Sequence, residues 1–453
     1  MLEPLTKKKA MARMKPLPIH PAPLKIGILG AGPAGLMTAL ALETYLEPGR
    51  AQITLLDRNK SETDYPGDEY GIQARACRAL ERIGHLEQAC ARGNASSELA
   101  FYNARLGKRF RSVAFNPRYT RNVVRQEFLA DLAGLLRQNP VQRRHIVTGL
   151  HANPDRSVTV NGTVDDAAFR ETFDLLVACD GVHSIVRKEV FPAKAVIHDR
   201  GFSCIYMLIE GAVETASAGF LGHANSGRNE LVMGRFSTMT MFKLGKGRLA
   251  LGIGFDHASK AKIWQSHGVP PDAEWKDLSV ATKKSIAVTL AKDSDIYDGM
   301  LVKALDLVPD WDSYKIYLWA MRDTDALTTP WSGSGNVVLI GDAAHAIMPT
   351  IGMGASLAIE DAEALAALIA AAANAAATAE DFRASAPSTI FHPFTAARHP
   401  VWVNLIDRAR RAAVGNFINV GQRKRFAIGP QIPNPTLSRV VTGVEWVADR
   451  LGV

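Results

Sequence analysis

The 453-residue sequence contains little cysteine, no closely paired histidines and no long apolar run. Its four cysteines are widely spaced, so they predict neither a disulfide framework nor a zinc ribbon and are typical of a reducing compartment. The twelve histidines form no HxH or HxxxH pair, so no metal site is expected. The longest apolar run, residues 364–373, is too short for a bilayer, which requires about 20 residues of helix. We therefore expect an alanine-rich helix there and no transmembrane segment.

The first 24 residues are basic and lack the apolar centre of a secretory signal peptide. They contain five basic residues and one acidic residue. We expect a flexible basic tail at residues 1–24 and a cytoplasmic protein.

The net charge of +8 is distributed unevenly along the chain. Residues 101–150 contain ten basic and two acidic residues, and residues 383–453 contain ten basic and three acidic residues. Such blocks are compatible with nucleic acid, with an anionic cofactor or substrate, or with solvated helix faces. Only a motif beside them decides between these alternatives.

Residues 25–57 read KIGILGAGPAGLMTALALETYLEPGRAQITLLD and contain a dinucleotide-binding pattern. A strand (25–29), a GxGxxG turn, a helix (36–46) and a second strand (52–56) that ends in an acid follow one another in the required order. The first glycine permits the tight turn, the second admits a pyrophosphate, and the third allows the helix to pack closely on the strand. Phosphates would bind at the helix N-terminus, and the acid would accept hydrogen bonds from ribose hydroxyls. The expected cofactor-binding residues are Gly30, Gly32, Pro33, Ala34, Gly35 and Asp57.

Two later segments repeat the arrangement of a strand that ends in an acid. Residues 173–187 read FDLLVACDGVHSIVR, in which a strand runs into Asp180 and Gly181. Residues 336–362 read NVVLIGDAAHAIMPTIGMGASLAIEDA, in which a strand runs into Gly341 and Asp342 before a glycine-rich turn and a helix. A carboxylate at the carboxyl end of a strand lies where open α/β sheets bind ligands, and the glycine-rich turn offers backbone N–H donors to an anion or a flavin.

Together the three segments resemble the single-component, class A FAD-dependent aromatic monooxygenases of the 4-hydroxybenzoate hydroxylase type, from about residue 25 to about residue 370. The second segment is similar to the DG motif of that family and the third to its GD motif. The resemblance implies an α/β fold, with a Rossmann-like FAD-binding domain (GR2-type), an inserted mostly-β substrate domain and a C-terminal helical segment. The expected boundaries are 25–200 and 326–382 for the FAD-binding domain, 201–325 for the substrate sheet, and 383–453 for the helical region.

The resemblance also implies roles for residues outside the first motif. Gly71 would line the cofactor, Arg125 would reach FAD from the start of a helix, and Asp342 would contact the ribityl–pyrophosphate region. Asp180 and Arg187 would take part in binding both FAD and the nicotinamide cofactor. The remaining residues expected at FAD from the GD segment are Gly341, Gly352, Gly354 and Ala355.

The GD segment departs from the family at GMGAS (352–356), where GQGAN is usual. Met353 has no amide and Ser356 is a shorter donor than asparagine, which puts side-chain contacts to the flavin in question but not backbone contacts. Cys179 is expected to be a small buried residue at the end of its strand. His345 is expected to pack within the motif rather than to act in catalysis.

The family reaction reduces FAD with NADH or NADPH and then uses O₂ to form a flavin C4a-hydroperoxide, which delivers one oxygen atom to the substrate. The resemblance thus implies hydroxylation of an aromatic or heteroaromatic small molecule, with no protein nucleophile and no metal. Epoxidation, N-hydroxylation or reduction on the same scaffold, and a non-catalytic flavin-binding module, remain alternatives. With no nucleic-acid motif present, the basic block around Arg125 is expected to face phosphate-bearing cofactors rather than nucleic acid.

Residues 201–256 alternate in polarity as strands do. We expect strands at Phe202–Glu210, Glu230–Thr240 and Arg248–Phe255, with turns at 223–228, which include His223, and at 245–247. The substrate-pocket candidates on these strands are Tyr206, Met233 and Arg235.

The C-terminal region is expected to form helices at Val403–Asn416 and Pro435–Leu451. It contains a basic cluster that consists of Arg408, Arg410, Arg411, Arg423, Lys424 and Arg425. We expect this region to cap the pocket, although pairing of protomers in a homodimer or contact with an anionic membrane surface are alternatives.

Overall fold

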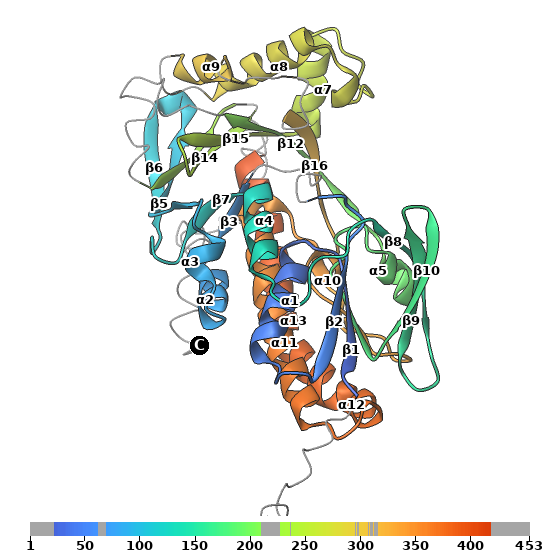
Figure 1. Cartoon of the computed structure of the whole chain (residues 1–453). Coiled ribbons are helices and arrows are strands. Elements are labelled where there is room, and N and C mark those ends of the chain that lie inside the picture. Colours follow the sequence, from blue (N-terminus) through green and yellow to red (C-terminus); the bar gives the residue numbers. More distant parts are fainter. Residues whose placement is uncertain are drawn as a thin grey trace, which may run out of the picture.

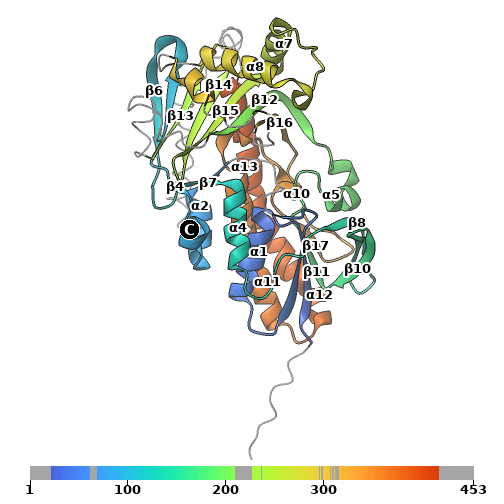
Figure 2. The same cartoon turned by 45° about the horizontal axis from the view of Figure 1, so that its top comes forward.

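The structure is a computed structural model of the chain, shown in Figures 1 and 2. It describes residues 22–61, 69–209, 227–235, 237–294, 296, 299–306, 308, 311 and 316–417. Residues 1–21 of the expected tail, the expected turn around His223, the expected helix at Pro435–Leu451 and the basic residues 423–425 lie outside the described residues.

A parallel four-stranded sheet forms the centre of the first part of the molecule. Its strand order is β17-β11-β1-β2, and each strand is an apolar segment buried on both faces, as parallel sheets require. The bounds are β1 (Leu24–Leu29), β2 (Ala51–Leu56), β11 (Leu175–Ala178) and β17 (Val337–Leu339). The carboxyl ends of β1, β11 and β17 therefore bring the three sequence motifs to one edge.

Helices cover one face of this sheet and a small antiparallel sheet covers the other (Figure 1). On the helical side, α1 packs along α11, and α4, α2 and α13 complete the layer. The helix bounds are α1 (Pro33–Tyr45), α2 (Ala74–Arg82), α3 (Leu86–Ala89), α4 (Arg125–Leu135), α5 (Ile185–Val190), α10 (Asp342–His345), α11 (Gly354–Ala375), α12 (Ala379–Ala386) and α13 (His392–Phe417). The covering sheet has the order β10-β9-β8, with β8 (His145–Ala152), β9 (Val158–Val164) and β10 (Ala167–Phe173).

A seven-stranded sheet lies above this layer, in the order β16-β12-β15-β14-β13-β5-β6 (Figures 1 and 2). The strands are β5 (Glu98–Asn103), β6 (Lys108–Ala114), β12 (His198–Ile209), β13 (Arg228–Met233), β14 (Thr238–Leu244), β15 (Arg248–Asp256) and β16 (Ile316–Asp323). Helices α7 (His257–Ser266), α8 (Val280–Asp293) and α9 (Met300–Leu305) cover its outer face around Trp264 and Met239. A three-stranded sheet, β3 (Glu69–Ile72), β7 (Arg121–Val124) and β4 (Asn94–Ala95), connects the two parts.

The strands and turns of the seven-stranded sheet follow the sequence predictions in part. The predicted strands beginning at Phe202 and at Arg248 are present as parts of β12 and β15, and Lys246 and Gly247 adopt positive φ in the predicted turn between β14 and β15. The prediction of one strand at Glu230–Thr240 was wrong, because β13 ends at Met233 and the chain turns back into β14. Asp293 fixes this turn by accepting hydrogen bonds from the Ser237 N–H at 3.0 Å and hydroxyl at 3.1 Å.

The seven-stranded sheet extends beyond residues 201–325, the range predicted for the substrate sheet. Strands β5 and β6 come from residues 98–114, and β5 pairs in parallel with β13, with Glu98 opposite Arg228 and Asn103 opposite Met233. The expected helix at Val403–Asn416 lies within the longer α13, which runs from the lower part of the molecule to the inner face of this sheet (Figure 1). In the described part of the chain, no helix has both the length and the apolar character needed to cross a membrane.

Candidate cofactor and substrate site

A cavity of about 2160 Å³ lies between the parallel sheet and the seven-stranded sheet. Single-ligand pockets usually have volumes of about 300–1,000 Å³, so the space is sufficient for a cofactor and a second ligand. Most of the residues expected from the sequence line it: Gly30, Gly32, Pro33, Ala34, Asp57, Gly71, Arg125, Asp180, Asp342, Gly352, Gly354, Ala355, Tyr206 and Met233. Four expected residues do not line it: Gly35, Arg187, Gly341 and Arg235.

The glycine-rich turn between β1 and α1 leaves room for a ligand at one position only. Gly30 has φ of +94°, and a Cβ there would collide with the Cys179 carbonyl, whereas a Cβ at Gly35 would collide with the Gly30 carbonyl. A Cβ at Gly32 would meet no protein atom within 4 Å. The first and third glycines therefore build the turn, and the second leaves open space at the N-terminus of α1, as a pyrophosphate group requires.

Asp57 follows β2 at the edge of the cavity and is nearly fully buried. Its two oxygens accept hydrogen bonds from the backbone N–H groups of Ala31 at 2.6 Å and Asn59 at 2.7 Å. Nη1 of Arg143 lies 3.6 Å from its Oδ1. Because Asp57 lines the cavity, a ribose hydroxyl that reached its carboxylate would add to these protein bonds.

Arg125, Tyr70 and Asp342 line the cavity and place a cation, an aromatic ring and a carboxyl group on its wall. Arg125 begins α4, and its guanidinium carbon is 5.4 Å from the centre of the Tyr70 ring. Asp342 faces the cavity, where burial raises the pKa of its carboxyl, while the positive charges of His345 and Arg125 lower it. A cation in the same cavity as the N-terminus of α1 suits an anionic dinucleotide.

Ser356, the residue that departs from the family pattern, fastens α11 to the end of β3. Its hydroxyl donates to the Gly71 carbonyl at 3.1 Å and accepts the Gln73 N–H at 2.9 Å. The side chain is therefore occupied by protein groups, and the glycine-rich turn before α11 offers its backbone to a ligand. No signal in the sequence indicated this bond, which connects residues 285 positions apart.

Asp180 of the DG motif presents an acceptor to the cavity. Its Oδ2 accepts the N–H groups of Ile185 at 2.8 Å and Val186 at 3.4 Å, which fixes the start of α5. Its Oδ1 is buried and has no hydrogen-bond partner among the described residues. Burial raises the pKa of Asp180, so a ligand hydroxyl that donated to Oδ1 would relieve an unsatisfied acceptor.

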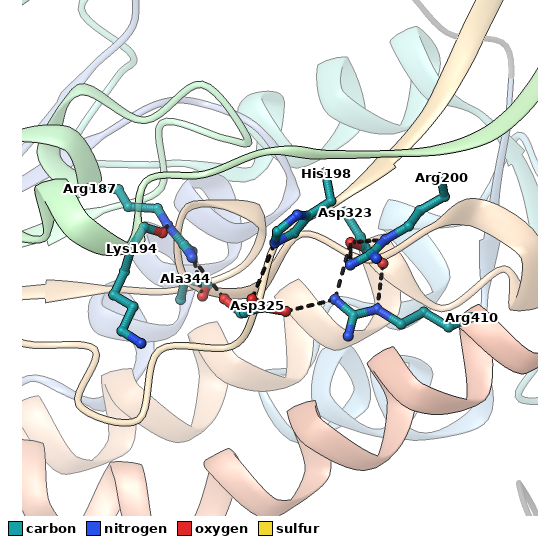
Figure 3. Close-up of polar contacts among 8 residues, drawn as sticks. All are labelled: Arg187, Lys194, His198, Arg200, Asp323, Asp325, Ala344 and Arg410. Atoms are coloured by element: carbon teal, nitrogen blue, oxygen red, sulfur yellow. Dashed lines mark hydrogen bonds and ion pairs between the residues drawn. The ribbon is translucent and has the colours of Figure 1, made fainter.

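Arg187 of the same motif lies outside the cavity and is buried. Its guanidinium donates to the backbone carbonyls of Lys194 at 2.8 Å, Ala344 at 2.8 Å and Asp325 at 2.7 Å (Figure 3). It also donates to the carbonyl of Ala343 at 3.2 Å. It therefore connects the DG helix α5 to the GD helix α10, rather than contacting the space in which a cofactor would lie.

His345 packs within the GD motif. It stacks on Trp402 of α13 with ring centres 4.5 Å apart, and its Nε2 is 2.5 Å from Asp361 Oδ2. Asp361 also accepts hydrogen bonds from Arg398 at 2.6 Å and from the Trp402 indole at 3.0 Å. The sequence did not indicate this buried cluster, because its members come from three helices.

The inner face of the seven-stranded sheet forms the opposite wall. Tyr206 of β12 stacks on Tyr317 of β16 with ring centres 5.7 Å apart, and Met233 lies further along the sheet. Arg235 was expected on this wall, but it is exposed in the turn after β13, because the strand ends at Met233. Glu69 also lines the cavity, although the sequence gave no reason to select it, and burial raises the pKa of its carboxyl to about 7.

A basic edge borders the cavity beside the DG motif. Burial lowers the pKa of His183, and the positive charges of Arg322, Lys188 and Arg58 lower it further. The convergence of these groups favours an anion. Among the described residues, no three His, Cys, Asp or Glu side chains are arranged to hold a metal ion.

The pattern of the FAD binding domain family matches residues 24–205 and 307–386. The chain belongs to this family. FAD is therefore its cofactor, and the open space at Gly32, the cation at Arg125 and the unsatisfied Asp180 Oδ1 fit that group.

The chain is also similar to individual proteins named as hydroxylases and monooxygenases. The chain is 25% identical to a salicylate hydroxylase from Sarocladium schorii over 63% of this chain and 57% of that protein, and 30% identical to one from Pseudomonas putida over 43% and 42%. The chain thus spans about half the length of these two relatives. It is 24% identical to a kynurenine 3-monooxygenase from Salinispora arenicola over 74% of this chain and 70% of that protein.

Solved structures show the same fold. Klebsiella pneumoniae HpxO in complex with FAD and uric acid matches with a TM-score of 0.68 at 18% identity, over 89% of this chain and 91% of that one. A salicylate hydroxylase in complex with substrate matches with a TM-score of 0.67 at 20% identity, over 94% and 95%. These matches confirm the predicted class A flavin-monooxygenase fold.

Proposed function

We propose that this member of the FAD binding domain family is a monooxygenase that hydroxylates an aromatic or heteroaromatic small molecule. The observation that carries the proposal is one continuous cavity that reaches from the glycine-rich turn to the sheet wall around Tyr206. The overall reaction converts substrate, O₂, NAD(P)H and a proton into hydroxylated substrate, water and NAD(P)⁺. Bound FAD supplies the electron transfer and the activation of oxygen.

In this proposal the residues of the chain bind the cofactor, orient the substrate and exclude water from the site. Gly32 and Arg125 receive the pyrophosphate, Asp57 the ribose, and Asp180 a further hydroxyl of the cofactor. The stacked pair Tyr206 and Tyr317 provides a planar surface against which an aromatic ring packs.

The basic edge around His183 supports NADH or NADPH as the electron donor. His183, Arg58 and Arg322 line the cavity, and Lys188 adds a further positive charge beside them. A dinucleotide that approaches this edge would meet several cations before it reaches the flavin.

The test is oxidation of NAD(P)H in air by the purified holoenzyme with a panel of phenols, anilines and quinolines. We expect at least one compound to accelerate NAD(P)H consumption and to gain one oxygen atom by mass spectrometry. Flavin-containing protein that shows no compound-dependent consumption across the panel would contradict the proposal. A product that is an epoxide, an N-hydroxyl or a reduced ring would reassign the reaction on the same scaffold.

A further inference from the structure

After α5 the chain crosses from the parallel-sheet part into the seven-stranded sheet and later returns, and these two crossings lie side by side. The first is the start of β12 and the second is the end of β16, where His198 pairs with Asp323 and Asp199 with Arg322. The residue after the second crossing is bonded to the GD motif. The Thr324 N–H donates to the Ala346 carbonyl at 3.0 Å.

Arg410 of α13 binds both acidic side chains at the second crossing (Figure 3). Its Nε donates to Asp323 Oδ2 at 2.8 Å, and its Nη2 donates to Asp323 Oδ1 at 3.2 Å and to Asp325 Oδ1 at 2.9 Å. Because Asp323 is 1% exposed, its charge requires compensation by bonded cations. Arg200 of β12 supplies the other cation, with its Nε 2.7 Å from Asp323 Oδ1.

Asp325 extends this contact to both cofactor motifs. Its carboxylate lies 3.2 Å from Nε2 of His198, which belongs to the first crossing. Its backbone carbonyl accepts the Nη2 of Arg187, which also binds the Ala344 carbonyl of the GD helix. Residues 323–325 of the second crossing are thus bonded to α13, to the DG helix and to the first crossing (Figure 3).

The same turn of α13 forms part of the cavity wall. Arg408, Arg411 and Ala412 line the cavity, while Arg410 points toward the crossings (Figure 3). Ala409 packs against the sheet, and its carbonyl accepts the hydroxyl of Thr350, which lies in the loop before the glycine-rich turn, at 2.7 Å. Because Arg410 lies on this turn of α13, its bonds to residues 323–325 fix both a wall of the cavity and the place where the chain passes between the two sheets.

We infer that Arg410 is a positioning residue, which holds the two crossings against the DG and GD motifs and thereby sets how the substrate sheet closes over the FAD site. It touches neither cofactor nor substrate and acts through Asp323 and Asp325. The expected effect of Arg410 on turnover rests on the proposed function. Its expected effect on how well the protein shields FAD from solvent rests on the fold alone.

The experiment compares holoenzyme with Arg410→Ala and with Arg410→Lys, which keeps the charge but loses the two-pronged contact. The control is Arg118→Ala, which removes an arginine from an exposed pair with Glu81 outside the cavity lining. Iodide quenching of FAD fluorescence measures how accessible the bound FAD is to solvent, and it requires no turnover. The ratio of hydrogen peroxide formed to NAD(P)H consumed measures how well oxidation of the cofactor remains coupled to the substrate.

We expect Arg410→Ala to retain FAD and to raise both the iodide quenching constant and the peroxide ratio by about threefold or more, with Arg410→Lys intermediate and Arg118→Ala unchanged. If Arg410→Ala does not fold, the intermediate values of Arg410→Lys decide the question. A variant that retains wild-type quenching and coupling and loses only thermal stability would overturn the inference. Wild-type protein that consumes no NAD(P)H would contradict the proposed function, and the quenching series would still decide the inference.

A double-mutant cycle with Asp323→Asn provides a second test of the same relationship. Because Arg410 acts through Asp323, the quenching increase in the double variant should be smaller than the sum of the increases in the single variants. Additive increases would show that Arg410 acts elsewhere and would overturn the inference.

Discussion

The hydroxyl of Ser356 donates to the carbonyl of Gly71, so the first turn of α11 is bonded directly to the end of β3. This bond holds the glycine-rich turn against the strand that borders the cavity. Ser356→Ala should therefore lower the free energy of unfolding by about 1 kcal/mol and weaken FAD binding. Thermal unfolding with and without added FAD measures both effects. Equal stability and equal FAD affinity in the variant would show that the bond contributes to neither.

Gly30 and Gly32 should respond differently to alanine. Gly32→Ala meets no protein atom, so the apoprotein should unfold at the wild-type temperature but bind FAD at least tenfold more weakly, because a methyl group fills the pyrophosphate space. Gly30→Ala introduces both a positive-φ strain and a collision with the Cys179 carbonyl, so it should lower the unfolding temperature itself. Circular dichroism melting and flavin content per protein separate the two. The assignment fails if Gly32→Ala binds FAD normally.

Glu69 should make the stability of the apoprotein fall as the pH rises. Its pKa is raised from 4.5 to about 7 by burial, so the folded state retains a proton that the unfolded state has already lost between these values. The associated stability is complete below pH 4.5 and is lost by about pH 7, with a magnitude of at most about 3 kcal/mol. Urea unfolding at pH 5 and pH 8 measures it.

Glu69→Gln is the matched control for that pH dependence. The amide does not titrate, so the variant should show a smaller decrease in stability between pH 5 and pH 8 than the wild type. Identical decreases in the two proteins would assign the pH dependence to other groups.

Asp361→Asn should be the most destabilising of these changes. The carboxylate is fully buried and accepts donors from His345, Arg398 and Trp402. Its neutralisation leaves the buried cation of Arg398 with Glu360, at 3.2 Å, as its charged partner. Loss of one member of such a buried group costs about 3–5 kcal/mol. Asp165→Asn, whose ion pair with Arg144 is exposed on both sides, should cost about 1 kcal/mol or less. Chemical denaturation measures the free energy of unfolding of both variants. Equal losses would contradict the conclusion that the buried carboxylate of Asp361 contributes more to stability than an exposed ion pair.

That residues of all three motifs line one cavity was predictable, because these residues are local to short motifs. A strand that ends in Asp57, Asp180 or Asp342 brings an acid to the carboxyl edge of a parallel sheet, and periodicity with glycine spacing is enough to recognise this. The same reasoning located Tyr206 and Met233, because alternation along a strand identifies one face of a sheet.

The parts that were missed depend on contacts between distant segments. Asp293 fixes the turn after Met233 from the end of α8, and nothing within residues 230–240 reveals that the strand is interrupted. Arg187 fits the spacing of the DG motif, yet the carbonyls of Asp325 and Ala344 direct its guanidinium away from the cavity. Such outcomes follow from tertiary packing and are not encoded in the local pattern.

The pairing of β5 with β13 has a consequence for recombination between relatives. Strand β5 pairs with β13, with Glu98 opposite Arg228, and β6 pairs with β5. Two strands of the seven-stranded sheet therefore come from residues 98–114, which precede most of the FAD-binding part. The sheet is therefore not a cassette that can be cut out at two positions. A chimera that exchanges only residues 201–325 would place foreign strands against native β5 and β6, whereas one that also carries residues 98–114 and 198–200 would transfer all seven strands together.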